Sequence, residues 1–112
     1  MKLKRYAFIF ICIVYSSAFA GDTVDLPANS RIFYSEEDCV EVMKLHYNWN
    51  IEFAAQILNM EKSGKFIKTS QNMPIRVIEK KTYKMFNYYK ISIYNRSTKQ
   101  YDIAWTDVDN LD

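Results

Sequence analysis

The fold is decided by residues 64–111, which read GKFIKTSQNMPIRVIEKKTYKMFNYYKISIYNRSTKQYDIAWTDVDNL. Apolar and polar side chains alternate with a period of two in three parts of this stretch, at residues 75–77, 89–93 and 101–105. Such alternation is typical of strands that bury one face. Polar residues separate the runs, and residues 95–100 predict the turn of a hairpin. The stretch therefore predicts a small antiparallel β unit.

The apolar side of this β unit should form the core of the domain. The residues expected on that side are Ile75, Val77, Ile91, Ile93, Ile103 and Trp105. A second apolar set recurs at spacings of three and four, which places its members on one face of a helix. The residues expected to face the core from that helix are Val42, Met43, Trp49, Ala54 and Leu58.

Residues 35–63 predict the helical part of the domain. Ser35 can accept a hydrogen bond from a free backbone N–H, and three acidic residues follow it, where the helix dipole favours negative charge. Gly64 is a natural left-handed stop for a helix. Two asparagines that flank Trp49 interrupt the apolar pattern, so the sequence fits both one bent helix and two separate helices.

The expected fold class is α+β, with residues 21–112 forming a single small domain. Residues 21–29 are polar and should form an extended or loose lead-in. Residues 31–34 could add a short strand before the helical segment of about 35–63. The β unit of about 64–111 follows.

The order of these elements resembles the small bacterial Src-homology-3-like (SH3-like) barrels of exported proteins. Those domains often show a glycine-led strand, an apolar-alternating strand, a strand pair, and then a small residue followed by Trp and a short tail. Here residues 64–67, 74–78, 90–93 and 104–111 fill those places, with Ala104 where a glycine is common. The resemblance implies that the β unit is a small antiparallel SH3-like barrel or curled sheet.

Residues 1–20 have the layout of a secretory signal peptide. A basic segment with Lys2, Lys4 and Arg5 precedes an apolar run at residues 7–15, and a small-residue segment ends at Ala20, where we expect cleavage. The apolar run is less than half of the about 20 residues that a spanning helix needs. We therefore expect a periplasmic or secreted protein with no transmembrane segment after cleavage.

Charge is unevenly distributed along the chain. Residues 21–61 hold eight acidic side chains against two basic ones, whereas residues 62–90 hold eight basic side chains against one acidic one. The chain as a whole has a formal net charge of +2, but three of its basic residues lie in the expected leader. An acidic helical region is thus followed by a basic β region.

Lysine and aromatic residues alternate within this basic region. Cations attract anionic groups, and aromatic faces stack on sugars and other flat groups. The candidate binding residues are Lys80, Lys81, Tyr83, Lys84, Tyr88, Tyr94 and Trp105. They would contact a protein partner or an anionic envelope polymer, and export argues against a nucleic acid. The alternative is that the lysines solvate a variable loop while the aromatic residues pack the core, or that the basic face meets the acidic helix.

The residues of catalytic or metal chemistry are sparse. Cys39 is the only cysteine after the leader, and it could be a buried, inert thiol or link two chains as a dimer. His46, the only histidine, lies two helical turns, or about 10 Å, beyond Cys39, which is too far for a thiolate–imidazole pair. There is no zinc spacing, and Asp107, Asp109 and Asn110 only faintly resemble a calcium loop. We therefore expect a non-enzymatic protein without a metal or cofactor.

Three functional hypotheses follow from the sequence. The first is an exported, non-enzymatic binding or interaction module of the bacterial cell envelope. The second is a periplasmic immunity protein or inhibitor of a toxin or hydrolase, which the small size and the charge split favour. The third is a small hydrolase, which requires His46 to be exposed in a cleft beside an acid or a nucleophile.

Overall fold

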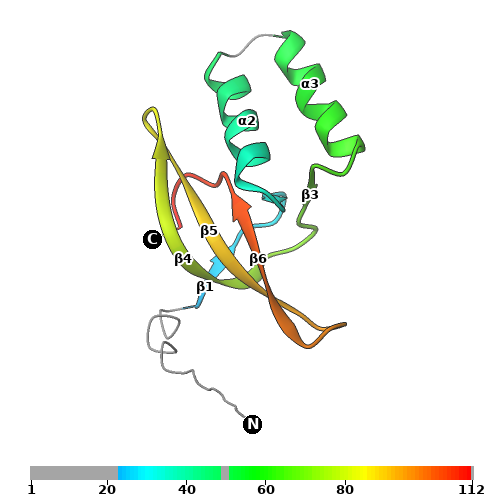
Figure 1. Cartoon of the computed structure of the whole chain (residues 1–112), viewed down its shortest axis with the longest axis vertical. Helices are drawn as coiled ribbons and strands as arrows, with labels where there is room; N and C mark the ends of the chain where they lie inside the picture. Colours follow the sequence, from blue (N-terminus) through cyan, green and yellow to red (C-terminus); the bar gives the residue numbers. More distant parts are fainter. Residues whose placement is uncertain (1–22, 49–50, 112) are drawn as a thin grey trace.

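Two helices and a six-stranded antiparallel sheet make up the computed structural model, which describes residues 23–48 and 51–111 (Figure 1). The elements in chain order are β1 (Thr23–Leu26), β2 (Arg31–Phe33), α2 (Glu36–Tyr47), α3 (Ile51–Lys62), β3 (Phe66–Lys68), β4 (Met73–Tyr83), β5 (Phe86–Asn95) and β6 (Gln100–Thr106). The α+β prediction is confirmed. The expected leader lies outside the described residues. Of the helices within the described ranges, none combines the length and the apolar character needed to cross a membrane.

The sheet is strongly curved, and its strands follow the order β1-β4-β5-β6-β2-β3 (Figure 1). The short strand expected near residue 31 is confirmed as β2, while the expected lead-in contributes an edge strand, in which Thr23 pairs with Arg76 of β4. Strand pairing does not close a barrel, because β1 and β3 lie at opposite edges. The loops beside these edges are nevertheless joined, since the Asn29 N–H donates to the Thr69 carbonyl at 2.8 Å and the Thr69 N–H donates to the Ser30 carbonyl at 2.9 Å.

The central strand β5 is buried on both faces. Its neighbouring residues Tyr88 and Tyr89 point to opposite sides, as successive residues of a strand do, and both are buried. The core between the helices and the sheet contains Phe33, Cys39, Val42, Met43, Leu45, Ile57, Phe66, Tyr88 and Trp105. The core on the other face contains Leu26, Ile32, Ile75, Tyr89, Ile91, Ala104 and Leu111. The sheet is therefore the middle layer between two apolar clusters.

The helical part consists of two helices, which settles the alternative that the sequence left open. Ser35 caps α2 as predicted, because its hydroxyl accepts a hydrogen bond from the Asp38 N–H at 3.1 Å. Gly64 follows α3 with a φ of +82°, which confirms the predicted left-handed stop. Trp49, which was expected to face the core, lies outside the described residues.

Two residues expected in the core are exposed. Ile103 shares a face of β6 with Trp105 but lies farther from the helices, and its side chain is 48% exposed. Leu58 is 49% exposed because α3 presents Ile57 to the core, flanked by the half-buried Phe53 and Met60. The predicted face of α3 was therefore wrong by one residue, or about 100° of rotation.

The other core expectations agree with the structure to different degrees. Burial is confirmed for Val42, Met43, Ile75, Ile91 and Trp105. Val77 and Ile93 are partly buried and pack against the core on the face away from the helices. Ala54 is half-buried on α3.

Substituting Leu111 should show how strongly the chain end supports the second core. We expect Leu111→Ala to lower the free energy of unfolding by about 2–4 kcal/mol, because the substitution leaves a cavity among packed apolar side chains. Urea denaturation followed by tyrosine and tryptophan fluorescence measures this change. The exposed Leu58 serves as the control, and Leu58→Ala should change the stability by less than about 0.5 kcal/mol. Equal losses in the two variants would show that Leu111 does not pack as described.

Candidate functional site

The residues predicted to bind a partner do not form one patch. Tyr88 and Trp105 are core residues with 6% and 9% exposure, and Tyr83 packs against the same cluster. Lys84 lies at the tip of the β4–β5 hairpin, whereas Tyr94 lies near the other end of β5. Lys80 is exposed on β4. The structure therefore separates Tyr94 from the other candidates.

Glu36, in the first turn of α2, gathers part of the predicted patch into a structural contact. Lys81 donates to its carboxylate at 2.9 Å and the Tyr88 hydroxyl donates to the same oxygen at 2.7 Å. The hydrogen bond from Lys81, followed by that from Tyr88, lowers the pKa of Glu36. Burial, together with the bond to Glu36, raises the pKa of Tyr88 to about 12. At Lys81 the basic strand thus meets the acidic helix, as one of the two structural alternatives expected.

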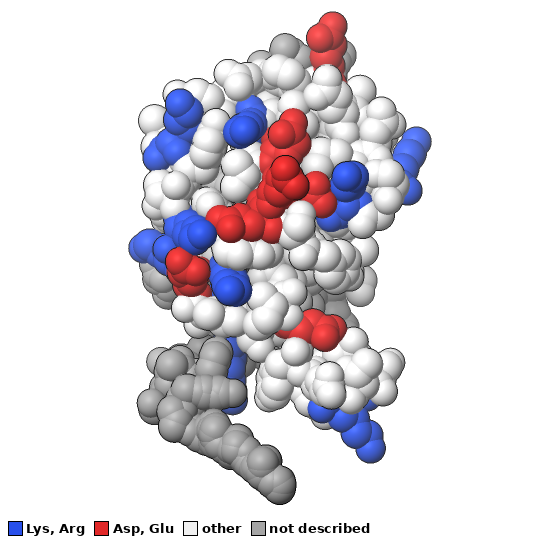
Figure 2. Space-filling model, in the orientation of Figure 1, with Lys and Arg blue, Asp and Glu red and all other residues white. Residues whose placement is uncertain are grey.

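Trp105 packs against the same lysine and tyrosine that bind Glu36. The Nζ atoms of Lys81 and Lys90 are 5.4 and 5.8 Å from the centre of its ring, and the ring of Tyr88 is 5.9 Å away. These distances are those of cation–π and aromatic contacts. Figure 2 shows acidic side chains gathered over α2, with basic side chains to either side. The ion pairs Lys81–Glu36 and Lys65–Asp38 thus join the acidic helix α2 to the basic region that follows the helices.

An apolar surface lies on the part of the sheet that the helices leave uncovered. We call it the distal sheet face and define it by Arg76, Tyr94, Tyr101 and Ile103. Tyr94 and Tyr101 are directly opposite each other in the β5–β6 pair, and their ring centres are 5.2 Å apart in an edge-to-face arrangement. They are 49% and 56% exposed. The Arg76 guanidinium lies 5.8 Å from the Tyr101 ring, which places a cation beside the aromatic pair.

The distal sheet face also contains a small open pocket. Its volume is about 180 Å³, and Arg76, Ser92, Tyr94 and Tyr101 are among the residues that line it. The side chains come from three neighbouring strands, so their spacing is fixed by the backbone hydrogen bonds of the sheet. The arrangement offers aromatic surface, one cation and a hydroxyl group without requiring a loop to move.

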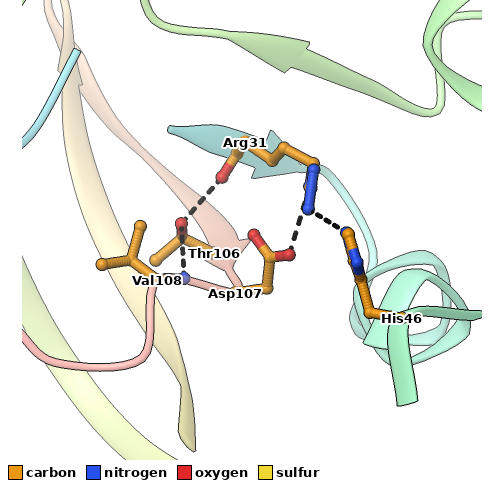
Figure 3. Close-up of polar contacts among 5 residues, drawn as sticks. All are labelled: Arg31, His46, Thr106, Asp107 and Val108. Atoms are coloured by element: carbon orange, nitrogen blue, oxygen red, sulfur yellow. Dashed lines mark hydrogen bonds and ion pairs between the residues drawn. The ribbon is translucent and has the colours of Figure 1, made fainter. Parts of the chain in front are cut away.

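A second polar cluster lies at the end of α2, between the helix and the chain end (Figure 3). We call Arg31, His46 and Asp107 the Arg31 cluster. Arg31 donates from Nε to the Asp107 carboxylate at 3.1 Å and from Nη2 to Nε2 of His46. The Arg31 carbonyl accepts a hydrogen bond from the Thr106 hydroxyl at 2.7 Å, which fixes the strand that carries the guanidinium. The cluster therefore connects β2, α2 and the segment after β6.

The pKa values of both Asp107 and His46 are shifted in the Arg31 cluster. Burial raises the pKa of Asp107, although the Arg31 guanidinium beside it acts in the opposite direction. Burial and then the charge of Arg31 lower the pKa of His46. Because Arg31 is always a donor, Nε2 of His46 must accept, so the imidazole is neutral and carries its proton on Nδ1.

The position of His46 meets only part of what a hydrolase requires. Its side chain is exposed and lines an open pocket together with Asp107 and Asp109. However, its Nε2 atom is held by Arg31, and none of the described residues that line this pocket is a serine, threonine or cysteine. This geometry provides no pairing of a base with a nucleophile of the kind used in covalent catalysis.

The other residues considered for redox or metal chemistry, Cys39, Asp107 and Asp109, are buried or bound to other groups of the protein. Cys39 is fully buried, as one alternative expected, and burial raises the pKa of its thiol. A disulfide to a second chain would require α2 to move. Within residues 23–48 and 51–111, no group of three or more His, Cys, Asp or Glu side chains could hold a metal ion. The acidic residues of the faint calcium pattern instead bind protein groups, Asp107 to Arg31 and Asp109 to the Asn87 N–H.

The sequence did not predict Arg31 as part of a polar cluster, nor Arg76 and Tyr101 as parts of the distal sheet face. Tyr101 could have been found, because a hairpin turn at residues 95–100 places it opposite Tyr94. Arg31 could not, because it is 76 positions from its partner Asp107 and no local pattern relates them.

No protein-family model matches this chain, and no curated protein and no solved structure matches it at a significant level.

The Arg31 cluster should make the stability of the protein depend on pH. The folded state holds the pKa of His46 below its ordinary value of 6.5, so the unfolded state binds the proton more tightly. His46 should therefore stabilise the fold less as the pH falls through 6.5 toward its folded-state pKa. Urea denaturation at a series of pH values between about 8 and 5 measures this loss.

His46→Gln is the matched variant for this measurement. The glutamine carbonyl can still accept from Arg31, but it does not titrate. The difference in free energy of unfolding between the two proteins should thus stay constant above pH 7.5 and change in favour of the variant below pH 6.5. A difference that is independent of pH would exclude the proposed contact between His46 and Arg31.

Proposed function

We propose that this protein is an exported, non-enzymatic binding module of the bacterial cell envelope and that it contacts its ligand through the distal sheet face. The basic, apolar and small-residue segments of residues 1–20 support export. The curved sheet, with its β4–β5–β6 meander, supports membership of the SH3-like class of small barrels. Neither argument depends on a catalytic residue.

One observation carries the proposal. Tyr94, Tyr101 and Ile103 expose about half of their side chains next to one another on one face of a regular sheet. Single exposed apolar residues are ordinary, but a contiguous exposed group of large apolar side chains marks an interaction site. Tyr101 and Ile103 lie on the same face of β6 as Trp105, but beyond the part of that face that the helices cover, so they are exposed while Trp105 is buried.

The ligand that fits this surface is an anionic polymer with sugar rings. Tyrosine rings provide flat apolar surface together with a hydroxyl group, which suits the apolar face and the hydroxyl edge of a sugar. Arg76 lies beside the aromatic pair, and the turn of the β5–β6 hairpin adds Arg96 and Lys99. Basic side chains around an aromatic centre attract and hold carboxylate or phosphate groups.

Removal of the aromatic pair tests the proposal. We expect the wild-type protein to sediment with purified peptidoglycan sacculi, which carry carboxylates, and Tyr94→Ala/Tyr101→Ala to lose at least about tenfold in apparent affinity, or roughly 1.4 kcal/mol. Binding by the wild type should weaken as the salt concentration rises, because salt screens the attraction between the basic side chains and the carboxylates. Sedimentation with neutral dextran beads serves as the ligand control.

Tyr34 provides a matched control residue. It is a highly exposed tyrosine outside the distal sheet face, and Tyr34→Ala should bind sacculi as the wild type does. Circular dichroism should show that both variants are folded. No binding by the wild type, or equal losses in both variants, would exclude the distal sheet face as the ligand site.

A second candidate function is an inhibitor or immunity protein that inserts its β5–β6 hairpin into the cleft of a toxin or hydrolase. The observation that favours it is the projection of this hairpin beyond the rest of the sheet (Figure 1). Beyond Ser92, β5 pairs only with β6 in the described part of the chain, so the hairpin end is narrow enough to enter a cleft. Inhibition of a secreted toxin encoded next to this gene, lost in the Tyr94→Ala/Tyr101→Ala variant, would favour this function over polymer binding.

A further inference from the structure

We propose that the pocket beside the Arg31 cluster binds an organic monocation of the alkylammonium or guanidinium class. We call it the cation pocket. Its volume is about 360 Å³, and it is lined by Arg31, Met43, His46, Phe86, Asp107 and Asp109. Pockets of this size hold small molecules or a single long side chain. The pocket is a second site, independent of the distal sheet face.

The two sites lie at opposite ends of the sheet. Phe86 begins β5, and Tyr94 is eight residues farther along the same strand. At about 3.3 Å per residue, the two side chains are about 26 Å apart along the strand. A ligand of monocation size therefore cannot contact both, and a substitution in one site leaves the other intact.

The charges that line the cation pocket favour a positive ligand. Asp107 neutralises Arg31 at 3.1 Å, and both of these side chains are mostly buried. His46 accepts a hydrogen bond from Arg31 and is therefore neutral. Asp109 adds a further carboxylate, which forms no ion pair within the part of the chain that the structure describes. The lining thus carries one uncompensated negative charge.

Asp109 is also held in place for this role. Its Oδ1 accepts a hydrogen bond from the Asn87 N–H at 2.8 Å, and its carbonyl accepts one from the Asn87 side chain at 3.2 Å. The Tyr89 hydroxyl donates to the same carbonyl at 3.4 Å. A carboxylate has about four acceptor positions, so Asp109 can bind a cation without releasing Asn87.

The apolar wall of the cation pocket suits the alkyl and charged parts of such a ligand. Met43 contributes a thioether, and Phe86 contributes a ring that is 42% exposed. Aromatic faces attract ammonium and guanidinium groups, and aliphatic stems pack on apolar side chains. The lysine closest in sequence to Phe86 does not compete for this wall, because Nζ of Lys84 lies 5.5 Å from the ring of Tyr47 and 5.9 Å from that of Tyr83.

Binding is measured by titrating the purified ¹⁵N-labelled protein with n-butylammonium and, separately, with N-acetyl-lysine methylamide. We expect saturable shifts of the amide signals of Asn87 and Asp109, with dissociation constants in the millimolar range, as is usual for ligands with about five to fifteen heavy atoms. Stronger binding of the lysine derivative would identify a partner's side chain as the source of the cation. Equal or stronger binding of n-butylammonium would identify a free amine.

Neutral analogues and charge variants make the test specific. n-Butanol and N-acetyl-norleucine methylamide have similar shapes without the charge, and they should bind at least about tenfold more weakly. Asp109→Asn keeps the acceptor for Asn87 and removes only the charge, and it should weaken cation binding by about tenfold or more. Asp25→Asn, an exposed change on β1, should have no effect.

The outcomes separate this proposal from the preceding one. The Tyr94→Ala/Tyr101→Ala variant should bind both cations as the wild type does, whatever happens to polymer binding. No saturable shift, equal binding of the neutral analogues, or unchanged binding by Asp109→Asn would each overturn the cation pocket.

Discussion

The structure depends on the burial of β5 on both faces. Tyr88 and Tyr89 are adjacent in the sequence, yet they lie in different cores, and each hydroxyl group binds a different layer. Tyr88 donates to Glu36 at the start of α2, whereas Tyr89 donates to the Asp109 carbonyl and accepts from the Leu111 N–H. Each hydroxyl keeps its ring buried without leaving a polar atom unsatisfied. One strand thus fixes both the helices and the chain end.

This constraint explains where the exposed surfaces lie. The helices are too short to cover the whole of one face of the sheet, so Trp105 is buried beneath them, whereas Tyr101 and Ile103 on the same face of β6 are exposed. At the other end of β5, the chain end that Tyr89 secures brings Asp107 and Asp109 beside α2. The positions of both proposed sites therefore depend on where the helices and the segment after β6 end along β5.

Sequence patterns predicted the parts of the fold that depend on neighbouring residues. The cap at Ser35, the stop at Gly64 and the β5–β6 hairpin are local features, and all three are present. The rotation of α3 and the extent of helix cover depend on contacts between distant residues, so Leu58 and Ile103 were placed wrongly. For the same reason, most residues of the two proposed sites could not be grouped from the sequence, since they meet only after the layers have packed.

The pairing of early strands with late ones determines when the sheet can assemble. β1 pairs with β4, and β2 lies between β6 and β3, so both early strands pair with strands that emerge later during synthesis. The Arg31 carbonyl, for example, meets the Thr106 hydroxyl across 75 positions. Folds dominated by such distant contacts form slowly, because the chain loses loop entropy before the contacts compensate for it. A chain of this topology is therefore expected to remain unfolded for longer during synthesis, which suits the export proposed above, because a translocation channel admits an unfolded chain.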